Sequence, residues 1–243
     1  SFFNVCIHRI PRKESIIFPS SHCPTCNNSI KPWHNLPILS FLILKGKCAN
    51  CGKRISWRYP LVELITPILF ILLFNRFGLS LAFLKYTIFF SLSIIIFFID
   101  IDYQIIPDIL SLPLIPLGLI LSLISTDVSI TSSLIGGFAG FIFFYLIMVL
   151  YPLIRGKEGM GGGDTKYIAG IGTFLGIPGV LFSIFISSIL ALFVLLPLRA
   201  GKKVNLKNQF PYRPFLVTAA IIYVLVGYEL IDAYLSFYEL LRY

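Results

Sequence analysis

Charged residues are scarce in this sequence. They make up 13% of the 243 residues, whereas 57% of the residues are hydrophobic. Soluble domains typically carry roughly 25% charged residues, and a soluble domain of this composition has no way to keep so much apolar surface from water. The scarcity of charge therefore excludes an ordinary soluble protein and indicates a polytopic membrane protein whose surroundings are the lipid bilayer.

Negative charge is scarcer than positive charge. The chain has 11 Asp and Glu residues against 20 Lys and Arg residues, which gives a formal net charge of +9. Such an excess also occurs in nucleic-acid-binding proteins. However, 17 of the 20 basic residues lie in the stretches 9–58, 155–166 and 199–213, between apolar segments. This pattern follows the positive-inside rule, so we expect these loops in the cytosol and no nucleic-acid partner.

The apolar runs predict the fold class. Runs suited to membrane-spanning helices cover residues 60–75, 80–100, 108–125, 131–154, 165–178, 179–198 and 214–238. The apolar residues 1–7 are interpreted as the end of a truncated first transmembrane helix, with a cleaved signal peptide as the alternative. The sequence thus predicts an all-α polytopic membrane protein of about eight transmembrane helices. Residues 8–59 form its one small soluble loop domain, and residues 60–243 form its transmembrane domain.

Cysteine is rare as well, and four of the five cysteines form two CxxC pairs: Cys23 with Cys26, and Cys48 with Cys51. This spacing is typical of a four-thiolate zinc site. The loop around the pairs has little apolar sequence, so a metal ion would supply its folding free energy. Disulfides would need an oxidising compartment, and the expected topology places the loop in the reducing cytosol. A redox or metal-cluster role remains the other alternative.

Because acidic side chains are costly inside a membrane, each one near an apolar run is a functional candidate. Asp100 and Asp102 follow one apolar run, and Asp108 opens the next. Residues two apart on a helix point to different faces, so we expect Asp100, which continues the apolar run, to face the bundle. For Asp108 the simpler interpretation is a role at the first turn of its helix.

A glycine-rich segment, Gly159-Met160-Gly161-Gly162-Gly163-Asp164-Thr165-Lys166, precedes a further apolar run. A phosphate-binding loop would need Lys followed by Ser or Thr after its last glycine, and it would follow a strand. Here an aspartate follows the glycines, and its charge would repel phosphate. We therefore interpret Gly161, Gly162 and Gly163 as room for a substrate backbone beside the Asp164 carboxylate.

Asp100 and Asp164 both lie at cytosolic helix ends in the expected topology. Two carboxylates that come close cannot both ionise readily, so one keeps its proton and the other stays charged. That arrangement is the one used by aspartic proteases. The simpler alternative is that each aspartate caps a helix or pairs with a nearby cation such as Lys166.

Several motifs together resemble the type IV prepilin peptidase family, a bacterial group of GxGD aspartyl proteases. The resemblance covers essentially the whole chain, in order and spacing. Its motifs are residues 1–11 (SFFNVCIHRIP), the two CxxC pairs, Arg58–Leu64, residues 99–102 (IDID) with 106–108 (IPD), and residues 161–166 (GGGDTK). The sequence departs from the family in a late segment that usually reads Phe-Gly-Pro-Phe and here reads Phe210-Pro211-Tyr212-Arg213-Pro214-Phe215.

The resemblance implies a multi-pass enzyme of the bacterial inner membrane with its active site facing the cytosol. It implies that Asp100 and Asp164 are the catalytic pair, and that the enzyme cleaves the basic leader of a prepilin or pseudopilin precursor after a glycine. It also implies methylation of the new N-terminal residue by S-adenosylmethionine, although the sequence has no recognisable methyl-donor pocket. Gly161, Gly162, Gly163, Lys166 and Glu63 are the candidate substrate-binding residues.

Two other classes of function stay open at the level of the sequence. Membrane acids also serve ion- or proton-coupled transporters, but those often contain internal repeats and midplane carboxylates, and no repeat is evident here. A zinc-knuckle scaffold protein of a secretion or pilus apparatus would carry the cysteines with incidental acids. Substitution of Asp100 and Asp164 separates these classes, because only a protease would lose precursor processing while still folding.

Overall fold

A computed structural model describes residues 1–156, 161–200, 212–227, 229–233 and 236. Within these residues every regular element is helical, and the only extended pairing is two isolated bridges in the loop domain, His22 with Ser29 and Lys47 with Arg54. The elements in chain order are α1 (Phe2–Arg9), η1 (Ile10–Arg12), η2 (Pro32–Asn35), α2 (Leu39–Ile43), α3 (Arg58–Phe77), α4 (Leu81–Tyr103), α5 (Asp108–Ile124), α6 (Ile130–Arg155), α7 (Gly162–Ala200), α8 (Arg213–Ile222) and η3 (Tyr223–Gly227). The prediction of an all-α fold is confirmed for this part of the chain.

Four of the described helices are long and apolar enough to cross a membrane: α3, α4, α6 and α7. The helix α5 and the segment Arg213–Gly227 are apolar but shorter. The count of eight spans therefore stays a prediction. The ranges chosen from hydropathy nevertheless match α3 to α6 closely, because helix length and apolar composition are both local properties of the sequence.

The long helix α7 breaks at Gly176, close to the boundary that hydropathy places between residues 178 and 179. Gly176 has φ 70° and ψ −172°, a backbone conformation that L side chains rarely adopt. A Cβ atom at this position would lie 2.5 Å from Ser132 Oγ. The same hydroxyl accepts a hydrogen bond of 3.2 Å from the Ile177 N–H, a donor close to the break. The break is thus stabilised by α6.

Side chains and glycines fix the other helix ends. The Ser80 hydroxyl accepts a hydrogen bond from the Phe83 N–H, and the Ser129 hydroxyl accepts one from the Ser132 N–H, so α4 and α6 both begin at serine N-caps. Gly78 ends α3 with φ 58°, which a glycine adopts without strain. The tight connection between α3 and α4 makes these two helices neighbours.

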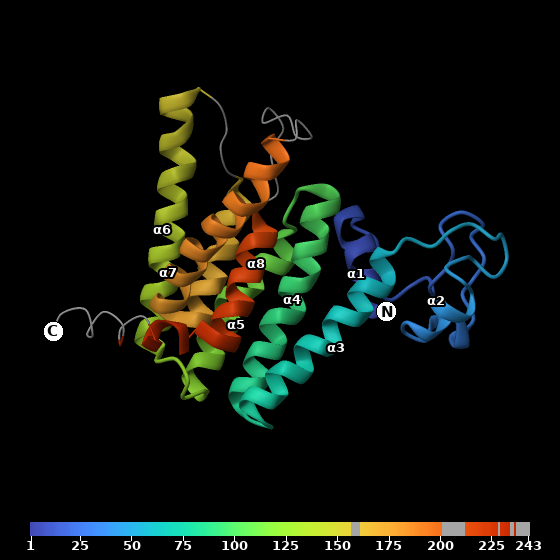
Figure 1. Cartoon of the computed structure of the whole chain (residues 1–243), viewed down its shortest axis with the longest axis horizontal. Coiled ribbons are helices and arrows are strands. Elements are labelled where there is room, and N and C mark those ends of the chain that lie inside the picture. Colours follow the sequence, from blue (N-terminus) through green and yellow to red (C-terminus); the bar gives the residue numbers. More distant parts are fainter. Residues whose placement is uncertain (157–160, 201–211, 228, 234–235, 237–243) are drawn as a thin grey trace.

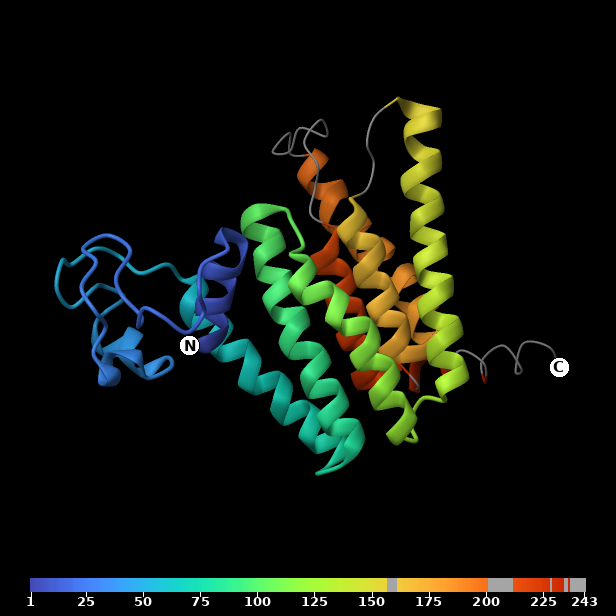
Figure 2. The same ribbon diagram turned by 180° about the vertical axis from the view of Figure 1, so that it is seen from behind.

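The helices α6 and α7 pack with their backbones in close contact. A Cβ atom on Gly172 of α7 would lie 2.3 Å from the Gly136 oxygen of α6, which is closer than any real contact. Small residues at such an interface allow the close approach that packs helices in membranes, where no hydrophobic effect drives them together. Figures 1 and 2 show α6 on one side of the bundle, with α7, α8 and α5 between it and α4.

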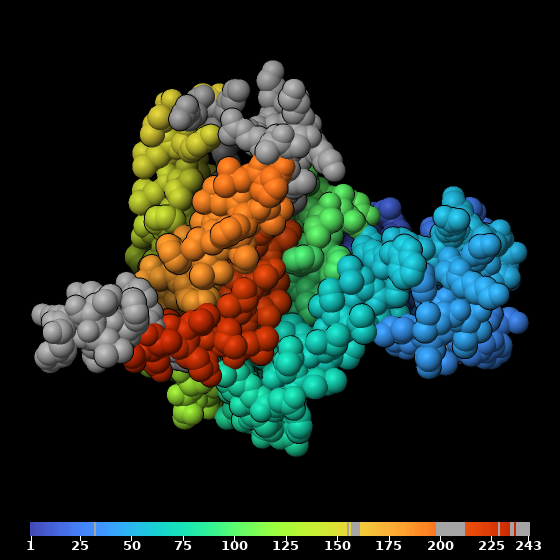
Figure 3. Space-filling model, viewed as in Figure 1, coloured from blue at the N-terminus to red at the C-terminus, as the bar shows by residue number. Residues whose placement is uncertain are grey.

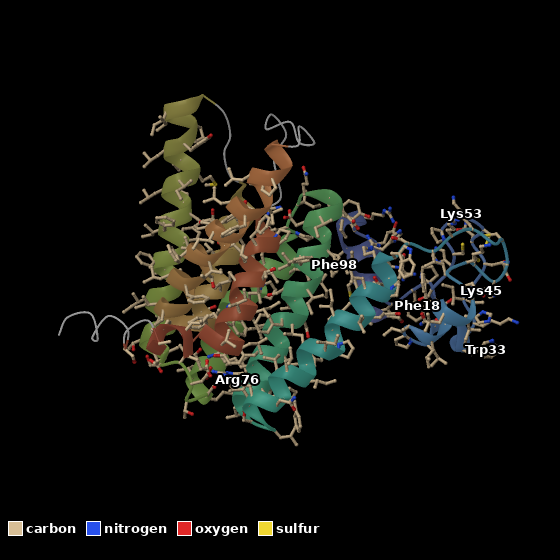
Figure 4. All side chains as sticks on the ribbon, viewed as in Figure 1. Phe18, Trp33, Lys45, Lys53, Arg76 and Phe98 are labelled. Atoms are coloured by element: carbon tan, nitrogen blue, oxygen red, sulfur yellow. The ribbon has the colours of Figure 1, made fainter. Side chains whose placement is uncertain are left out.

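The loop domain projects sideways from the bundle next to α1 and the start of α3 (Figure 3). Trp33, Lys45 and Lys53 point outward from it in Figure 4, and Trp33 is 60% exposed. The domain is tied back to α1 by Arg9, which donates hydrogen bonds to the Ser15 oxygen at 2.9 Å and the Ser20 oxygen at 3.4 Å. As its sequence predicts, this domain has little apolar core of its own.

Candidate functional site

Asp100 lies in the last turn of α4 and is fully buried, with 0% of its surface exposed. The helix ends three residues later, where Gln104 takes a left-handed conformation. Asp102 lies on the other side of this turn and forms an ion pair with Arg58, outside the core. The expectation that only Asp100 faces the bundle is therefore confirmed, because a helix rotates residues two apart onto different faces.

Asp164 lies in the first turn of α7, which begins at Gly162. It is 6% exposed, and its Oδ2 accepts a hydrogen bond of 3.3 Å from the Gly161 N–H. The positive end of a helix dipole favours a negative charge in this turn. The Asp164 carboxylate is thus held at the start of the helix that carries it.

Arg213, the first residue of α8, joins the two aspartates. Its Nε donates to Asp164 Oδ1 at 2.6 Å, its Nη2 contacts Asp164 Oδ2 at 3.3 Å, and its Nη1 donates to Asp100 Oδ1. Two carboxylates from α4 and α7 therefore meet on one guanidinium. The convergence predicted for Asp100 and Asp164 is present in the structure.

The two carboxylates differ in their hydrogen bonds. Both oxygens of Asp164 accept hydrogen bonds, from the Gly161 N–H and from Arg213. In contrast, Asp100 Oδ2 is buried and has no hydrogen-bond partner. A buried oxygen of this kind is better accommodated as a protonated hydroxyl than as part of a desolvated anion. Of the two carboxylates, only Asp100 therefore has an oxygen without a hydrogen-bond partner.

The predicted substrate-binding residues lie in three different environments. A Cβ atom on Gly161 would lie 3.4 Å from Arg213 Nη2, whereas one on Gly162 would meet nothing within 4 Å, and one on Gly163 would lie 2.9 Å from Ile106 Cβ. The glycine run thus borders the acid pair on one side and packs against the chain that follows α4 on the other. Only Gly162 faces open space.

Lys166 forms an ion pair of 2.7 Å with Asp108 Oδ1. Its side chain is 33% exposed, and that of Asp108 is 58% exposed. Asp108 opens α5, as its position after Pro107 predicts. The pair joins the starts of α5 and α7 beside the two aspartates, and the structure gives Lys166 no ion pair with either of them.

Glu63 lies elsewhere, on α3, where it faces the loop domain. Its Oε2 accepts a hydrogen bond of 2.9 Å from the Ile38 N–H, and its Oε1 lies 3.3 Å from the Ser1 nitrogen. It lines a cavity of about 770 Å³ between α1, α3 and the loop domain, together with Asn4, His8 and Tyr59. A volume of this size holds a ligand of several hundred daltons.

Asn4, a residue that lines this cavity, carries a buried unpaired acceptor. It is 2% exposed, and its Nδ2 donates to the Tyr59 oxygen at 3.1 Å. Its Oδ1 is buried and has no hydrogen-bond partner. Buried polar atoms are almost always paired, so an unpaired acceptor beside a cavity is consistent with a ligand that donates to it.

The four cysteines of the CxxC pairs come together in the loop domain. All four Sγ atoms lie within 4.8 Å of one another, and Cys23 Sγ lies 3.9 Å from Cys51 Sγ. Sulfurs bound tetrahedrally to zinc at about 2.3 Å would be about 3.8 Å apart. All five cysteines are free thiols in this structure. The predicted donors therefore form a set that fits one zinc ion.

Backbone amides prepare two of these sulfurs for metal binding. The N–H groups of Thr25 and Cys26 donate to Cys23 Sγ and lower the pKa of this thiol to about 6. Hydrogen bonds from the Cys51 and Asn50 backbone lower the pKa of Cys48 as well. Because zinc binds the thiolate form, these hydrogen bonds favour the ligating state of Cys23 and Cys48, whereas the pKa of Cys26 is raised to about 11 beside the other thiols.

The sequence interpretation missed Arg213. The arginine was counted in the basic stretch 199–213 and lies in the departure from the family pattern at residues 210–215, but it was given no role at the site. The signal that could have identified it is a single cation immediately before an apolar run, at the membrane border where the two acids were expected. Its partners could not be read from the sequence, because they lie on α4 and α7.

Comparison with known proteins assigns both halves of the chain to one family. Residues 1–77 match the bacterial peptidase A24 N-terminal domain, and residues 87–196 match the type IV leader peptidase family. Three similar relatives are named prepilin leader peptidase/N-methyltransferase. The relative from Neisseria gonorrhoeae is 39% identical over 90% of this chain and 84% of its own length. The relative from Bacillus subtilis is 37% identical over 98% and 92%, and that from Pseudomonas aeruginosa is 31% identical over 98% and 90%. No solved structure matches the chain.

Proposed function

Because the chain belongs to the type IV leader peptidase family, we propose that it is a membrane aspartyl endopeptidase that removes the basic leader of prepilin-like precursors. The observation that carries the proposal is the meeting of Asp100 and Asp164 on one guanidinium, at the junction of α4, α7 and α8. The relatives named above are prepilin leader peptidases, which supports the same substrate class for this chain.

In the proposed mechanism, Asp164 accepts a proton from water as the water oxygen attacks the scissile carbonyl carbon. Asp100 donates its proton to the carbonyl oxygen, and a tetrahedral intermediate forms. When the C–N bond breaks, Asp164 gives its proton to the leaving amine, which becomes the new N-terminus of the pilin, and Asp100 takes a proton back from a hydroxyl group of the intermediate as the carboxyl group of the leader forms. The cycle thus returns Asp100 to its protonated form and Asp164 to its charged form. The water molecule supplies the hydroxyl group gained by the leader and the hydrogen gained by the new amine.

The place of the acid pair suits a precursor with a positive leader and an apolar helix. Asp100 and Asp164 lie at ends of apolar helices; Asp164 belongs to the basic stretch 155–166, and both contact Arg213 of the basic stretch 199–213. Under the positive-inside rule this end faces the cytosol of a bacterial inner membrane. A leader in the cytosol and an apolar helix in the bilayer would bring the scissile bond, which follows a glycine, to this depth.

An apolar groove on the outer face of α4, the face that carries Asp102, is the candidate site for the precursor's apolar segment. It has a volume of about 580 Å³ and lies between α2, the start of α3 and the end of α4. Phe98 and Ile101, which flank Asp100 in the sequence, line it together with Leu61 and Leu64. Phe98 is near the end of α4 that is remote from Arg76 in Figure 4.

We further propose that the cavity of about 770 Å³ at Glu63 is the methyltransferase site, since the relatives also carry the name N-methyltransferase. When bound there, S-adenosylmethionine supplies an electrophilic methyl group. Glu63 would hold the α-amino group of the new N-terminus and remove its proton. The unpaired Asn4 Oδ1 would accept a hydrogen bond from the donor molecule. Cys23, Cys26, Cys48 and Cys51 would hold zinc, which shapes one wall of the cavity.

The test is a single incubation with two mass readouts. The purified protein in detergent is mixed with a prepilin precursor and S-adenosylmethionine, and the products are weighed. Cleavage lowers the precursor mass by that of the leader, and methylation adds one methyl group to the product. A precursor that keeps its full mass, in the presence of folded protein, would favour the transporter or scaffold alternative.

A further inference from the structure

Arg213 is the cation that the structure places against both aspartates. Its side chain is 11% exposed, that of Asp164 is 9% exposed and that of Asp100 is fully buried. Charges held this close in a dry site interact far more strongly than they do in water. The charge of the guanidinium must therefore affect when each carboxylate gains or loses its proton.

The residues on either side of Arg213 fix the position of its backbone. Tyr212, the preceding residue, contacts Ser187 Oγ at 2.6 Å and Ser188 Oγ at 3.3 Å through its hydroxyl, which ties the start of α8 to α7. The following residue, Pro214, suits the first turn of a helix. Arg213 thus reaches the acids from a fixed backbone position.

The described acidic and basic side chains of the end of α4 and the start of α7, apart from the two aspartates, are already paired. The helix α8 packs against α4 and α7. On those helices Asp102 pairs with Arg58, and Lys166 pairs with Asp108. The remaining titratable groups of α4, α7 and α8 near this end, within the described residues, are Tyr103, Tyr167 and Tyr212. Arg213 is therefore the one described cation in ion-pair contact with the pair.

We propose that Arg213 is a positioning residue that sets the charge state of the catalytic pair and moves the working pH range of this peptidase downward. The proposal rests on the peptidase function proposed above. A cation beside a carboxylate favours its charged form, so the pair keeps its single shared proton only at a lower pH than it would without the arginine.

The test is the pH profile of precursor cleavage by the wild-type protein and three variants. An aspartic pair gives a bell-shaped profile whose two limbs report the pair as a unit. Arg213→Gly and Arg213→Gln remove the charge, and both limbs should move upward by about 1 to 3 pH units. Arg213→Lys keeps the charge, and its limbs should stay within about half a unit of the wild-type ones.

The outcomes separate this inference from the proposed function. Wild-type protein that never cleaves the precursor would contradict the proposed function itself. Cleaving protein whose limbs do not move in Arg213→Gly and Arg213→Gln would overturn the role of Arg213, even if both variants lost activity uniformly at every pH. Thermal melting of each variant identifies any variant that fails to fold. Because Arg213→Gly and Arg213→Gln both remove the charge, the test needs only one of them to fold.

Discussion

Lys85 and Asp127 form an ion pair at the end of α4 remote from Asp100. Lys85 is fully buried, and its Nζ lies 3.3 Å from both oxygens of Asp127, in the connection between α5 and α6. The Ser125 and Tyr86 hydroxyls also donate to Asp127. Burial alone would raise the pKa of Asp127, but these hydrogen bonds and the Lys85 charge together lower it.

We expect Asp127→Asn to destabilise the protein by about 3 to 5 kcal/mol, because it leaves a buried ammonium without a counter-charge. Thermal melting in detergent measures the loss. The double variant Lys85→Met/Asp127→Leu should recover much of it, since it removes both charges. A lowered pKa in the folded state also means that the stabilisation is complete above the ordinary pKa of an aspartate. It should be lost only as the pH falls through the lowered value. An Asp127→Asn variant as stable as the wild type would contradict this account.

Removal of zinc should affect only the loop domain. Chelation, or Cys48→Ser, takes away the metal that would fold residues 23–51, and so we expect these residues to become sensitive to protease while the helical bundle stays intact. Limited proteolysis followed by mass spectrometry locates the cuts, and metal analysis gives the zinc content. The buried Cys6→Ser variant is the control for loss of a thiol. Unchanged protection of the loop after complete chelation would contradict a zinc-dependent fold.

Glu63→Gln should separate the two activities. If Glu63 removes the proton of the substrate amine, methylation falls by about 10²- to 10⁴-fold. Cleavage should stay within about threefold of wild type, because Asp100 and Asp164 lie elsewhere. The exposed Glu229→Gln variant is a matched control, since Glu229 pairs only with Arg76 among the described contacts. Equilibrium binding of S-adenosylmethionine to Glu63→Gln, measured without precursor, separates two causes of lost methylation. Unchanged binding means that the variant lacks the base, and weaker binding means that its site for the methyl donor is damaged. Equal losses of both activities would contradict separate sites.

The break in α7 predicts a large cost for a side chain at Gly176. Gly176→Ala places a Cβ atom against Ser132 and forces a positive φ on alanine, so we expect a loss of about 1 to 3 kcal/mol. Gly162→Ala is the control, because its Cβ would meet nothing within 4 Å. The thermal unfolding midpoints of the two variants, each compared with that of the wild type, test this expectation. Equal midpoints would mean that α7 tolerates a continuous helix at this point.

Local features of the sequence were sufficient for much of the fold. Hydropathy predicts the long helices, and serines and glycines at their ends agree with the observed caps at Ser80 and Ser129. The CxxC spacing predicts the thiol cluster, because each pair folds as a local knuckle. Even the side of α4 that carries Asp100 follows from helix geometry alone.

Features made by distant segments could not be predicted in the same way. The Arg213 bridge depends on how α8 packs against α4 and α7, and the cavity at Glu63 depends on how the loop domain lies on α1. The number of membrane crossings also stays a prediction, because α5 and the α8 region are short, and length alone does not tell whether they cross.

Cleavage of one precursor by Asp100→Asn and by Asp164→Asn tests the central claim most directly. Each substitution keeps the shape of the side chain but removes the acid, so each should lower the cleavage rate by roughly 10³-fold or more. Each variant should still bind S-adenosylmethionine and still methylate a peptide that already lacks its leader. Cleavage within about tenfold of the wild-type rate by either folded variant would contradict catalysis by this pair of aspartates.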